Sequence, residues 1–166
     1  MASISNNEIK KVKSLQLKKV RDEEGLFIVE GEKMVQEAID SPFNVVTVYR
    51  KSEIGEEQMK RISALANPSP ALAVVKKPSD AYVSDPAQLD SLISEGGLFL
   101  ALDTIRDPGN LGTILRIADW FGIKAVFATD DTVDLFNPKV VQATMGAIFR
   151  VKMHYVDLPE LSEKVI

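Results

Sequence analysis

The sequence predicts an α/β protein built from two consecutive units. Helix and strand patterns alternate along both halves of the 166 residues, and a segment rich in proline, serine and acidic residues separates the halves. The apolar fraction of 45% and a mean hydropathy of −0.01 are typical of a chain that forms a core. We expect a small α/β/α domain over 1–78, a linker over 79–97, and part of a parallel-sheet domain over 98–166.

The first unit alternates amphipathic segments with short β-branched runs. Residues 6–20 follow helical spacing, and most lysines in them lie off the apolar stripe. Two more helices are predicted at 32–40 and 56–66, and three strands at 25–31, 44–50 and 71–77.

The second unit begins with a continuous apolar run at 98–102, which is typical of a strand buried on both faces. A short helix at 86–94 is expected within the linker. The later elements are a helix at 111–121, a strand at 124–129, a helix capped by Asn137 and ended by Gly146, a strand at 147–156, and a helix that starts at Asp157. Because parallel sheets usually hold about 5 to 6 strands, we expect the domain to continue beyond residue 166.

A turn-rich loop lies between the first strand and helix of this second unit. Asp107 favours a turn, Pro108 and Gly109 suit its geometry, and Asn110 is expected to cap the helix. The loop would place backbone N–H groups at the carboxyl edge of a strand, where open α/β sheets bind ligands. An ordinary strand-to-helix turn remains the alternative. The glycines at 109, 112 and 122 do not fit the G-x-G-x-x-G dinucleotide pattern.

The helix that follows this loop has two faces. Gly112, Arg116 and Trp120 lie roughly opposite its apolar arc, with Ile117 at one flank. A tryptophan and an isoleucine facing away from the sheet predict a second covered surface, most simply another subunit. Gly112 would leave room for Arg116 to reach back to the loop; alternatively, Arg116 pairs with Asp119 or with glutamates on the surface. The apolar arc consists of Leu111, Ile114, Leu115, Ala118 and Phe121.

Charge is unevenly distributed along the chain. The total is −4, yet residues 1–21 carry six bases against Glu8, a local charge of +5 that leaves −9 for the remainder. A basic arm on an acidic body fits a polyanionic partner such as RNA, and a solvated helix face is the alternative. The bases are Lys10, Lys11, Lys13, Lys18, Lys19 and Arg21.

Several chemistries are excluded by composition. The chain has no cysteine, which rules out disulfides and thiolate metal sites, and a single histidine, His154, which argues against a histidine-built metal site. We expect His154 to be structural and Tyr82 and Tyr155 to pack or to stack on bases. With no signal-peptide core and no apolar run near the ~20 residues of a membrane span, we expect a cytoplasmic protein without membrane association.

Four segments resemble one protein family. Residues 102–123, "LDTIRDPGNLGTILRIADWFGI", resemble motif 1 of the SpoU/TrmH-type RNA ribose 2′-O-methyltransferases of the SPOUT superfamily. Residues 137–151, "NPKVVQATMGAIFRV", resemble the segment that follows it, with Thr144 where a serine often stands. "GLFIVEGEKMVQEAI" and "SPALAVVKK" resemble the family's RNA-binding domain, whose fold is like that of ribosomal protein L30e.

The resemblance implies a fold, a reaction and site residues. The second unit would be the N-terminal part of an α/β-knot domain, which acts as a homodimer. Arg116 matches the catalytic arginine, Asn110 the active-site asparagine, and Glu30 with Gly31 the acidic-glycine pair of the RNA-binding domain. The reaction would be methyl transfer from S-adenosylmethionine to a ribose 2′-hydroxyl of rRNA or tRNA.

One departure from the family limits what this chain is expected to do alone. The two later knot motifs, of the G-x-E-x-x-G and S-L-N-V types, are absent from residues 157–166. We therefore expect the 166-residue chain to neither form the knot nor bind S-adenosylmethionine, and to be inactive alone. The alternatives are a non-catalytic RNA-binding protein with an L30e-like module and, less well supported, a dinucleotide- or phosphate-binding enzyme.

Overall fold

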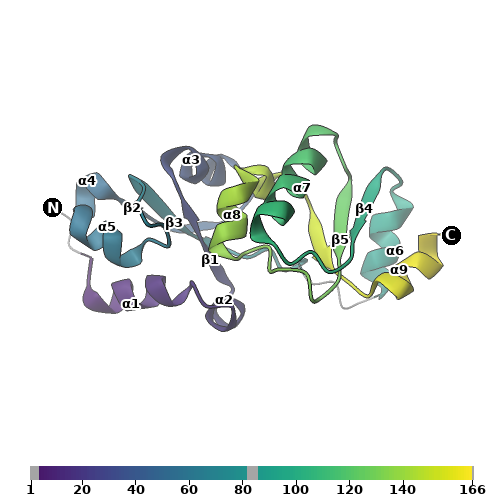
Figure 1. Ribbon diagram of the computed structural model, residues 1–166, viewed down its shortest axis with the longest axis horizontal. Helices are drawn as coiled ribbons and strands as arrows, with labels where there is room; N and C mark the ends of the chain where they lie inside the picture. The colour runs from purple at the N-terminus through teal and green to yellow at the C-terminus, as the bar shows by residue number, and fades with distance from the viewer. Residues whose placement is uncertain (1–3, 82–85, 166) are drawn as a thin grey trace.

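The computed structural model of the protein describes residues 4–81 and 86–165. Two three-stranded sheets lie one after the other along the long axis of the molecule, so that the first and the last helix are on opposite sides of its middle (Figure 1). In the described part of the chain, no helix is both long and apolar enough to cross a bilayer.

The first sheet is antiparallel and lies between two helical layers. Its order is β1-β3-β2, with β1 (Leu26–Glu30), β2 (Val45–Arg50) and β3 (Ala71–Lys76). Successive residues of a strand face opposite sides, so Ile28 packs with α1 and α5 while Phe27 and Val29 pack with α3. The α/β/α arrangement is therefore as predicted. The helices are α1 (Asn6–Ser14), α2 (Lys18–Glu24), α3 (Glu32–Asp40), α4 (Lys51–Ile54) and α5 (Glu56–Ile62).

The single helix predicted over 6–20 is two helices. Ser5 and Glu8 form a capping box that starts α1, and Leu17 is extended between α1 and α2. The contacts of Arg21 explain why one helix can end and another begin here. Its guanidinium donates to the carbonyl oxygens of Leu15 and Gln16 at 3.0 and 2.8 Å, which satisfies groups that a helix end leaves free.

The second sheet is parallel, in the order β4-β5-β6. The central strand β5 (Ala125–Ala128) is buried throughout, whereas β4 (Phe99–Leu102) is an edge strand and only Leu102 in it is buried. The prediction that 98–102 is buried on both faces is therefore wrong in this structure. The remaining elements are α6 (Pro86–Ser94), α7 (Pro108–Trp120), α8 (Pro138–Thr144), the 3₁₀ turn η1 (Ala147–Phe149), β6 (Met153–Tyr155) and α9 (Leu158–Val165).

A strand is predicted over 147–156, but only the last part of this segment, Met153–Tyr155, is a strand. Met145 and Gly146 take left-handed backbone angles, with φ of 48° and 95°, and turn the chain into η1 instead. This turn directs Ile148 and Phe149 into the core rather than along the sheet edge. The predicted end of the preceding helix near Gly146 is confirmed, because α8 ends at Thr144.

The two sheets share one hydrophobic core. The ring of Phe27 on β1 lies 4.9 Å from that of Phe136, and the ring of Phe43 lies 5.3 Å from that of Phe149. These pairs belong to a single buried cluster that also includes residues of α3, α7 and β5. Helix α8 accordingly lies against β1 between the two sheets (Figure 1). Each unit therefore contributes apolar surface that the other covers.

Candidate functional site

Asp107 caps helix α7. Its carboxylate accepts a hydrogen bond from the backbone N–H of Asn110 at 2.7 Å, and Pro108 is the first helical residue. An aspartate here satisfies a free N–H and complements the positive end of the helix. The prediction that Asn110 is the cap is therefore wrong. Asn110 lies in the first turn with an exposed side chain, which leaves its amide accessible to a ligand.

The loop before α7 is tied to the loop that follows β5. Thr104 has a left-handed backbone conformation, with a φ of 57°, which a β-branched residue rarely adopts, and its contacts hold it there. Its N–H donates to Thr129 Oγ1 at 2.9 Å, and its hydroxyl donates to the Asp131 carboxylate at 3.0 Å. Left-handed β-branched residues are costly, so these contacts fix the loop at the carboxyl ends of β4 and β5. Nothing in the local sequence of Thr104 indicates this conformation.

Arg116 is exposed on α7 and, among the described residues, has no ion pair. The alternative that it pairs with Asp119 is wrong, because Asp119 accepts instead from Arg150 Nε at 2.8 Å. Arg150 also donates to Glu37 at 2.8 Å and so links α3 to α7. The hydrogen bonds that Arg150 donates to Glu37 and Asp119 raise its pKa, whereas burial lowers it. Asp119 is thus engaged, and the Arg116 guanidinium is left to bind an external anion.

Exposed apolar side chains surround Arg116. Ile117, Trp120 and Met145 are 49%, 86% and 61% exposed, and they line one groove together with Arg116, Lys33 and Arg150. Such a concentration of exposed apolar surface is unusual on a monomer. It is the surface on which the sequence predicts a covering partner.

Two details of the predicted helix faces are wrong. Phe121 is 70% exposed, because α7 ends at Trp120 and the chain turns away before Phe121 can join the apolar arc. Gly112 faces α8: a Cβ at this position would lie 2.4 Å from Ala143 Cβ. Gly112 therefore permits close helix packing and does not make room for Arg116.

The predicted RNA-contacting lysines are exposed on α1 and α2. Three of them form exposed ion pairs, which contribute little to stability. The pairs are Lys11 with Glu24, Lys18 with Asp22, and Lys19 with Glu23. Lys10 and Lys13 have no ion pair with any described residue. Of this set, these two lysines are the ones most readily available to an anion.

Arg21 is not available to RNA in this structure. Its side chain is 1% exposed, and its Nη2 lies 2.8 Å from the Asp134 carboxylate, which is 5% exposed. The predicted contact role of Arg21 is therefore corrected to a structural one that joins α2 to the loop before α8. Sequence reasoning missed this role because Asp134 lies 113 residues away.

Glu30 is buried at the end of β1 and held by two donors. Its carboxylate accepts from Ser63 Oγ and from the N–H of Ala64, each at 2.6 Å. Gly31 follows with a φ of 106° and donates to the Ala71 carbonyl at 3.0 Å. These contacts make Glu30 an anchor for the 63–65 segment.

A cleft lies between the two units, and both Glu30 and the first residue of α7, Pro108, line it. It is lined on one side by residues of the first unit and on the other by Pro108 and the beginning of α8, and its volume is about 300 Å³. We call it the interdomain cleft; Arg116 lies outside it, on the groove described above. The lining residues are Gln16, Ile28, Glu30, Ala64, Leu65, Pro108, Asn137, Pro138, Lys139, Val141 and Gln142.

The remaining candidate aromatic and histidine residues lie in the core or outside the described chain. Tyr155 is buried; its hydroxyl donates to the Val133 carbonyl and accepts from the Leu135 N–H, and burial, with the nearby Asp134 charge, raises its pKa. A stacking role for Tyr155 is therefore wrong. His154 is 1% exposed with Nδ1 2.6 Å from the Asp80 carbonyl oxygen, which fits a structural role. Tyr82 lies outside the described residues.

Comparison with known proteins finds a family match for each of the two units. Residues 97–165 match the SpoU rRNA Methylase family, and residues 6–77 match the MRM3-like substrate binding domain. The 23S rRNA (guanosine(2553)-2′-O)-methyltransferase of Bacillus subtilis is 28% identical over 98% of the chain and 67% of that protein. The mitochondrial rRNA methyltransferase 3 of Xenopus laevis is 34% identical over 81% of the chain and 36% of that protein.

A solved structure agrees with both matches. The rRNA methyltransferase from Sinorhizobium meliloti, solved with AdoMet bound, superposes with a TM-score of 0.83 at 28% identity, over 99% of this chain and 67% of that one. The chain thus spans about two thirds of the bacterial proteins and about a third of the mitochondrial one. These matches show that residues 97–165, which include helix α7, belong to the SpoU rRNA methylase family, and that residues 6–77 belong to the MRM3-like substrate binding domain family.

Proposed function

We propose that the protein containing this chain transfers a methyl group from S-adenosylmethionine to a ribose 2′-hydroxyl of ribosomal RNA. The observation that carries the proposal is the position of Arg116. It is exposed, lacks an ion pair within the described residues, and lies on the helix that begins with the turn at Asp107. The relatives' names, which specify rRNA, favour rRNA over tRNA as the substrate.

Arg116 supplies charge and geometry in this proposal. A guanidinium remains protonated at neutral pH, so it does not serve as the base that deprotonates the hydroxyl. It can hold a phosphate through two parallel N–H donors, which fixes the ribose and favours loss of the hydroxyl proton. A phosphate oxygen or another nearby group would accept that proton.

Asn110 complements Arg116 from the start of the same helix. The two residues are six positions apart, or about 9 Å along the axis at 1.5 Å per residue. The exposed Asn110 amide can donate and accept hydrogen bonds to a ribose or a base. We assign it to substrate orientation.

The described residues do not by themselves form a cofactor site. S-adenosylmethionine would supply the methyl group as a sulfonium. The side-chain hydroxyls at the carboxyl ends of β4 and β5, those of Thr104, Thr129 and Thr132, are engaged with one another and with Asp131 or the backbone. We therefore assign no residue of this chain to the cofactor.

We also propose that the groove around Arg116 is covered by a second copy of the protein. Trp120, Ile117 and Met145 supply its apolar surface, and Arg116 lies among them. Association there would exclude water from the guanidinium and strengthen its hold on a phosphate. The homodimer would thus complete the site as well as bury apolar surface.

The competing proposal is a non-catalytic RNA-binding protein. The exposed lysines of α1 and α2 support it, and it requires no cofactor. The two proposals make the same prediction for RNA binding and opposite ones for methyl transfer.

An experiment on the product separates them. The intact gene product is incubated with unmodified ribosomal RNA and methyl-labelled S-adenosylmethionine, and the RNA is then hydrolysed with alkali. A 2′-O-methyl group blocks cleavage of the adjoining phosphodiester, because the free 2′-hydroxyl is the nucleophile in that hydrolysis. Label in alkali-resistant dinucleotides supports ribose methylation. Label in mononucleotides indicates base methylation, and RNA binding without label favours the non-catalytic alternative.

A further inference from the structure

The interdomain cleft is lined by apolar and polar side chains of both units. Neither a role for helix α7 nor one for the lysines of α1 and α2 explains this lining. Its floor includes the buried side chains of Ile28 and Val141, and Leu65 and Pro108 are half-buried at its walls. Both units contribute to it, so its shape depends on how they are joined. The volume of about 300 Å³ is at the lower end of roughly 300–1,000 Å³ for small-ligand pockets. A space of this size can hold one nucleotide and excludes a duplex.

Hydrogen-bonding groups that line the cleft are free within the described part of the chain. Gln142 makes no side-chain hydrogen bond there. The Asn137 oxygen accepts from the N–H of Lys139 at 2.9 Å, which leaves its amide donors free, and Gln16 donates to the Ser63 carbonyl at 3.2 Å, which leaves its oxygen free. The cleft therefore offers donors and acceptors together. Such groups suit the edge of a nucleobase, which presents both.

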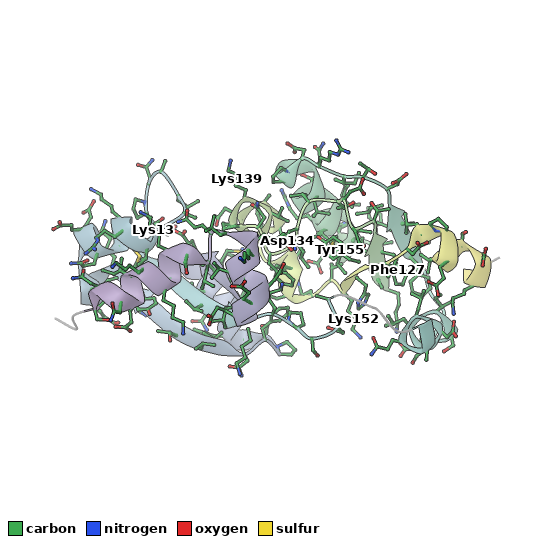
Figure 2. All side chains as sticks on the ribbon, turned by 90° about the horizontal axis from the view of Figure 1, so that it is seen from below. Lys13, Phe127, Asp134, Lys139, Lys152 and Tyr155 are labelled. Carbon is green, nitrogen blue, oxygen red and sulfur yellow. The ribbon has the colours of Figure 1, made fainter. Side chains whose placement is uncertain are left out.

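The charges of the cleft favour an anion at its rim and a neutral group inside. Lys139 is exposed and has no ion pair with a described residue. The opposing charge, Glu30, has both carboxylate oxygens occupied by donors of the 63–64 segment and is 4% exposed. In Figure 2, Lys139 lies toward the upper edge of the molecule and Lys152 toward the lower one, and Lys13 lies between these heights, beside α1. An RNA strand running from α1 to Lys139 would remain on one side.

We infer that the interdomain cleft binds a single unpaired nucleotide of the substrate RNA, with its phosphate at Lys139 and its base edge at Gln142 and Asn137. This inference rests on the proposed RNA substrate. The cleft reaches Pro108, the first residue of α7, so a nucleotide held here places its neighbour near Asn110 on the same helix. The cleft would then select which nucleotide reaches Arg116.

Binding by the 166-residue chain tests this inference. The probe is a short fluorescein-labelled single-stranded RNA of mixed sequence, with the matching duplex as a competitor. Lys139→Glu should weaken binding about tenfold and reduce the slope of log affinity against log salt by about 0.7, the value for one phosphate of a single strand. Gln142→Ala should weaken binding about fivefold with little change in slope, since it removes one uncharged hydrogen-bonding group.

Lys152→Glu is the matched control, because it makes the same charge change on the same unit at the opposite edge (Figure 2). It should change affinity less than twofold. Thermal melts check that the three substitutions, at the exposed Lys139 and Lys152 and the half-buried Gln142, leave the fold intact. As a direct check, RNA carrying 4-thiouridine should crosslink to the peptide that contains residues 137–142.

Three results would overturn the inference: equal losses in Lys139→Glu and Lys152→Glu, competition by the duplex as strong as by the single strand, or crosslinks confined to other segments. An absence of RNA binding by the unaltered chain would overturn it too. The methyl-transfer assay is separate. If transfer occurs and the cleft variants bind normally, only the cleft assignment fails; if the cleft binds but no transfer occurs, only the proposed reaction fails.

Discussion

The buried guanidinium of Arg21 and the carboxylate of Asp134 join the two units across 2.8 Å. Arg21 also donates to two carbonyl oxygens at the end of α1, so one side chain ends a helix and links that helix to the loop before α8. The nearby core is continuous through Phe27 and Phe136. The substrate-binding unit is therefore fixed relative to the catalytic unit, which the interdomain cleft requires.

Removal of one partner from this pair should destabilise the protein strongly. Arg21→Met removes the guanidinium that faces the buried Asp134 carboxylate, and breaking a buried pair in this way typically costs about 3–5 kcal/mol. The free energy of unfolding, measured by urea denaturation, should fall by that amount. Arg21→Met combined with Asp134→Leu should recover part of the loss. A loss below about 1 kcal/mol in the single variant would show that the pair does not hold the units together.

Gly112→Ala should destabilise α7 packing even though alanine favours helices. The added Cβ would lie 2.4 Å from Ala143 Cβ and 2.7 Å from its backbone carbon, which a rotamer change cannot relieve. Overpacking typically costs about 1–3 kcal/mol, against a gain of about 1 kcal/mol in helix propensity. Urea unfolding should show a net loss, and adding Ala143→Gly should restore only part of it because the backbone contact remains. A more stable Gly112→Ala protein would contradict the packing described here.

The contact between Thr104 and Asp131 should give stability that depends on pH in the acid range. Hydrogen bonds from Thr129 and Thr104 hold the pKa of Asp131 below its ordinary 3.8. A carboxylate with a lowered folded-state pKa stabilises the protein fully above its unfolded pKa, and that contribution is lost as the pH falls through the folded pKa. The stability difference between the unaltered protein and Asp131→Asn should thus be constant above about pH 5 and shrink below about pH 4. A difference that is independent of pH down to acid unfolding would argue against the contact.

Trp120→Glu should weaken self-association. The side chain is 86% exposed in the groove with Ile117 and Met145, and a charge there would have to be buried if a second copy covers it. Sedimentation of the intact gene product should show a dimer that becomes a monomer in this variant. Val46→Glu, at a 49% exposed position on the other unit, serves as the control and should leave the dimer unchanged. A monomeric unaltered protein would contradict the covering partner.

Short-range patterns predicted most of the elements but few of the long-range contacts. Periodicity placed α3 at Glu32–Asp40 and α6 at Pro86–Ser94 within the predicted bounds, because in each the apolar residues recur at helical spacing. Asn137 caps α8 as predicted, through a local hydrogen bond to the N–H of Lys139. These features depend on residues within one or two turns of each other.

Several of the errors arise where a distant residue decides the conformation. Arg21 reads as a surface base in its own segment, yet its partner Asp134 is 113 residues away. Gly112 is explained only by the approach of Ala143 on another helix, and the choice between Asp107 and Asn110 as the cap depends on which backbone turn precedes α7. The sequence was therefore sufficient to predict which segment holds the candidate site. The tertiary structure was needed to tell which of its side chains are paired and which are available to a ligand.

The measurement that tests the proposed function most directly is single-turnover methyl transfer by Arg116→Lys in the intact gene product. Lysine keeps the positive charge but cannot hold a phosphate through two parallel donors. The rate should fall about 10²-fold or more, comparable with the loss of one positioned donor in other active sites, while the melting temperature stays unchanged because Arg116 is exposed. Arg61→Lys, an exposed arginine on α5, should retain the full rate. Full turnover by Arg116→Lys would contradict the assignment of Arg116 as the phosphate clamp.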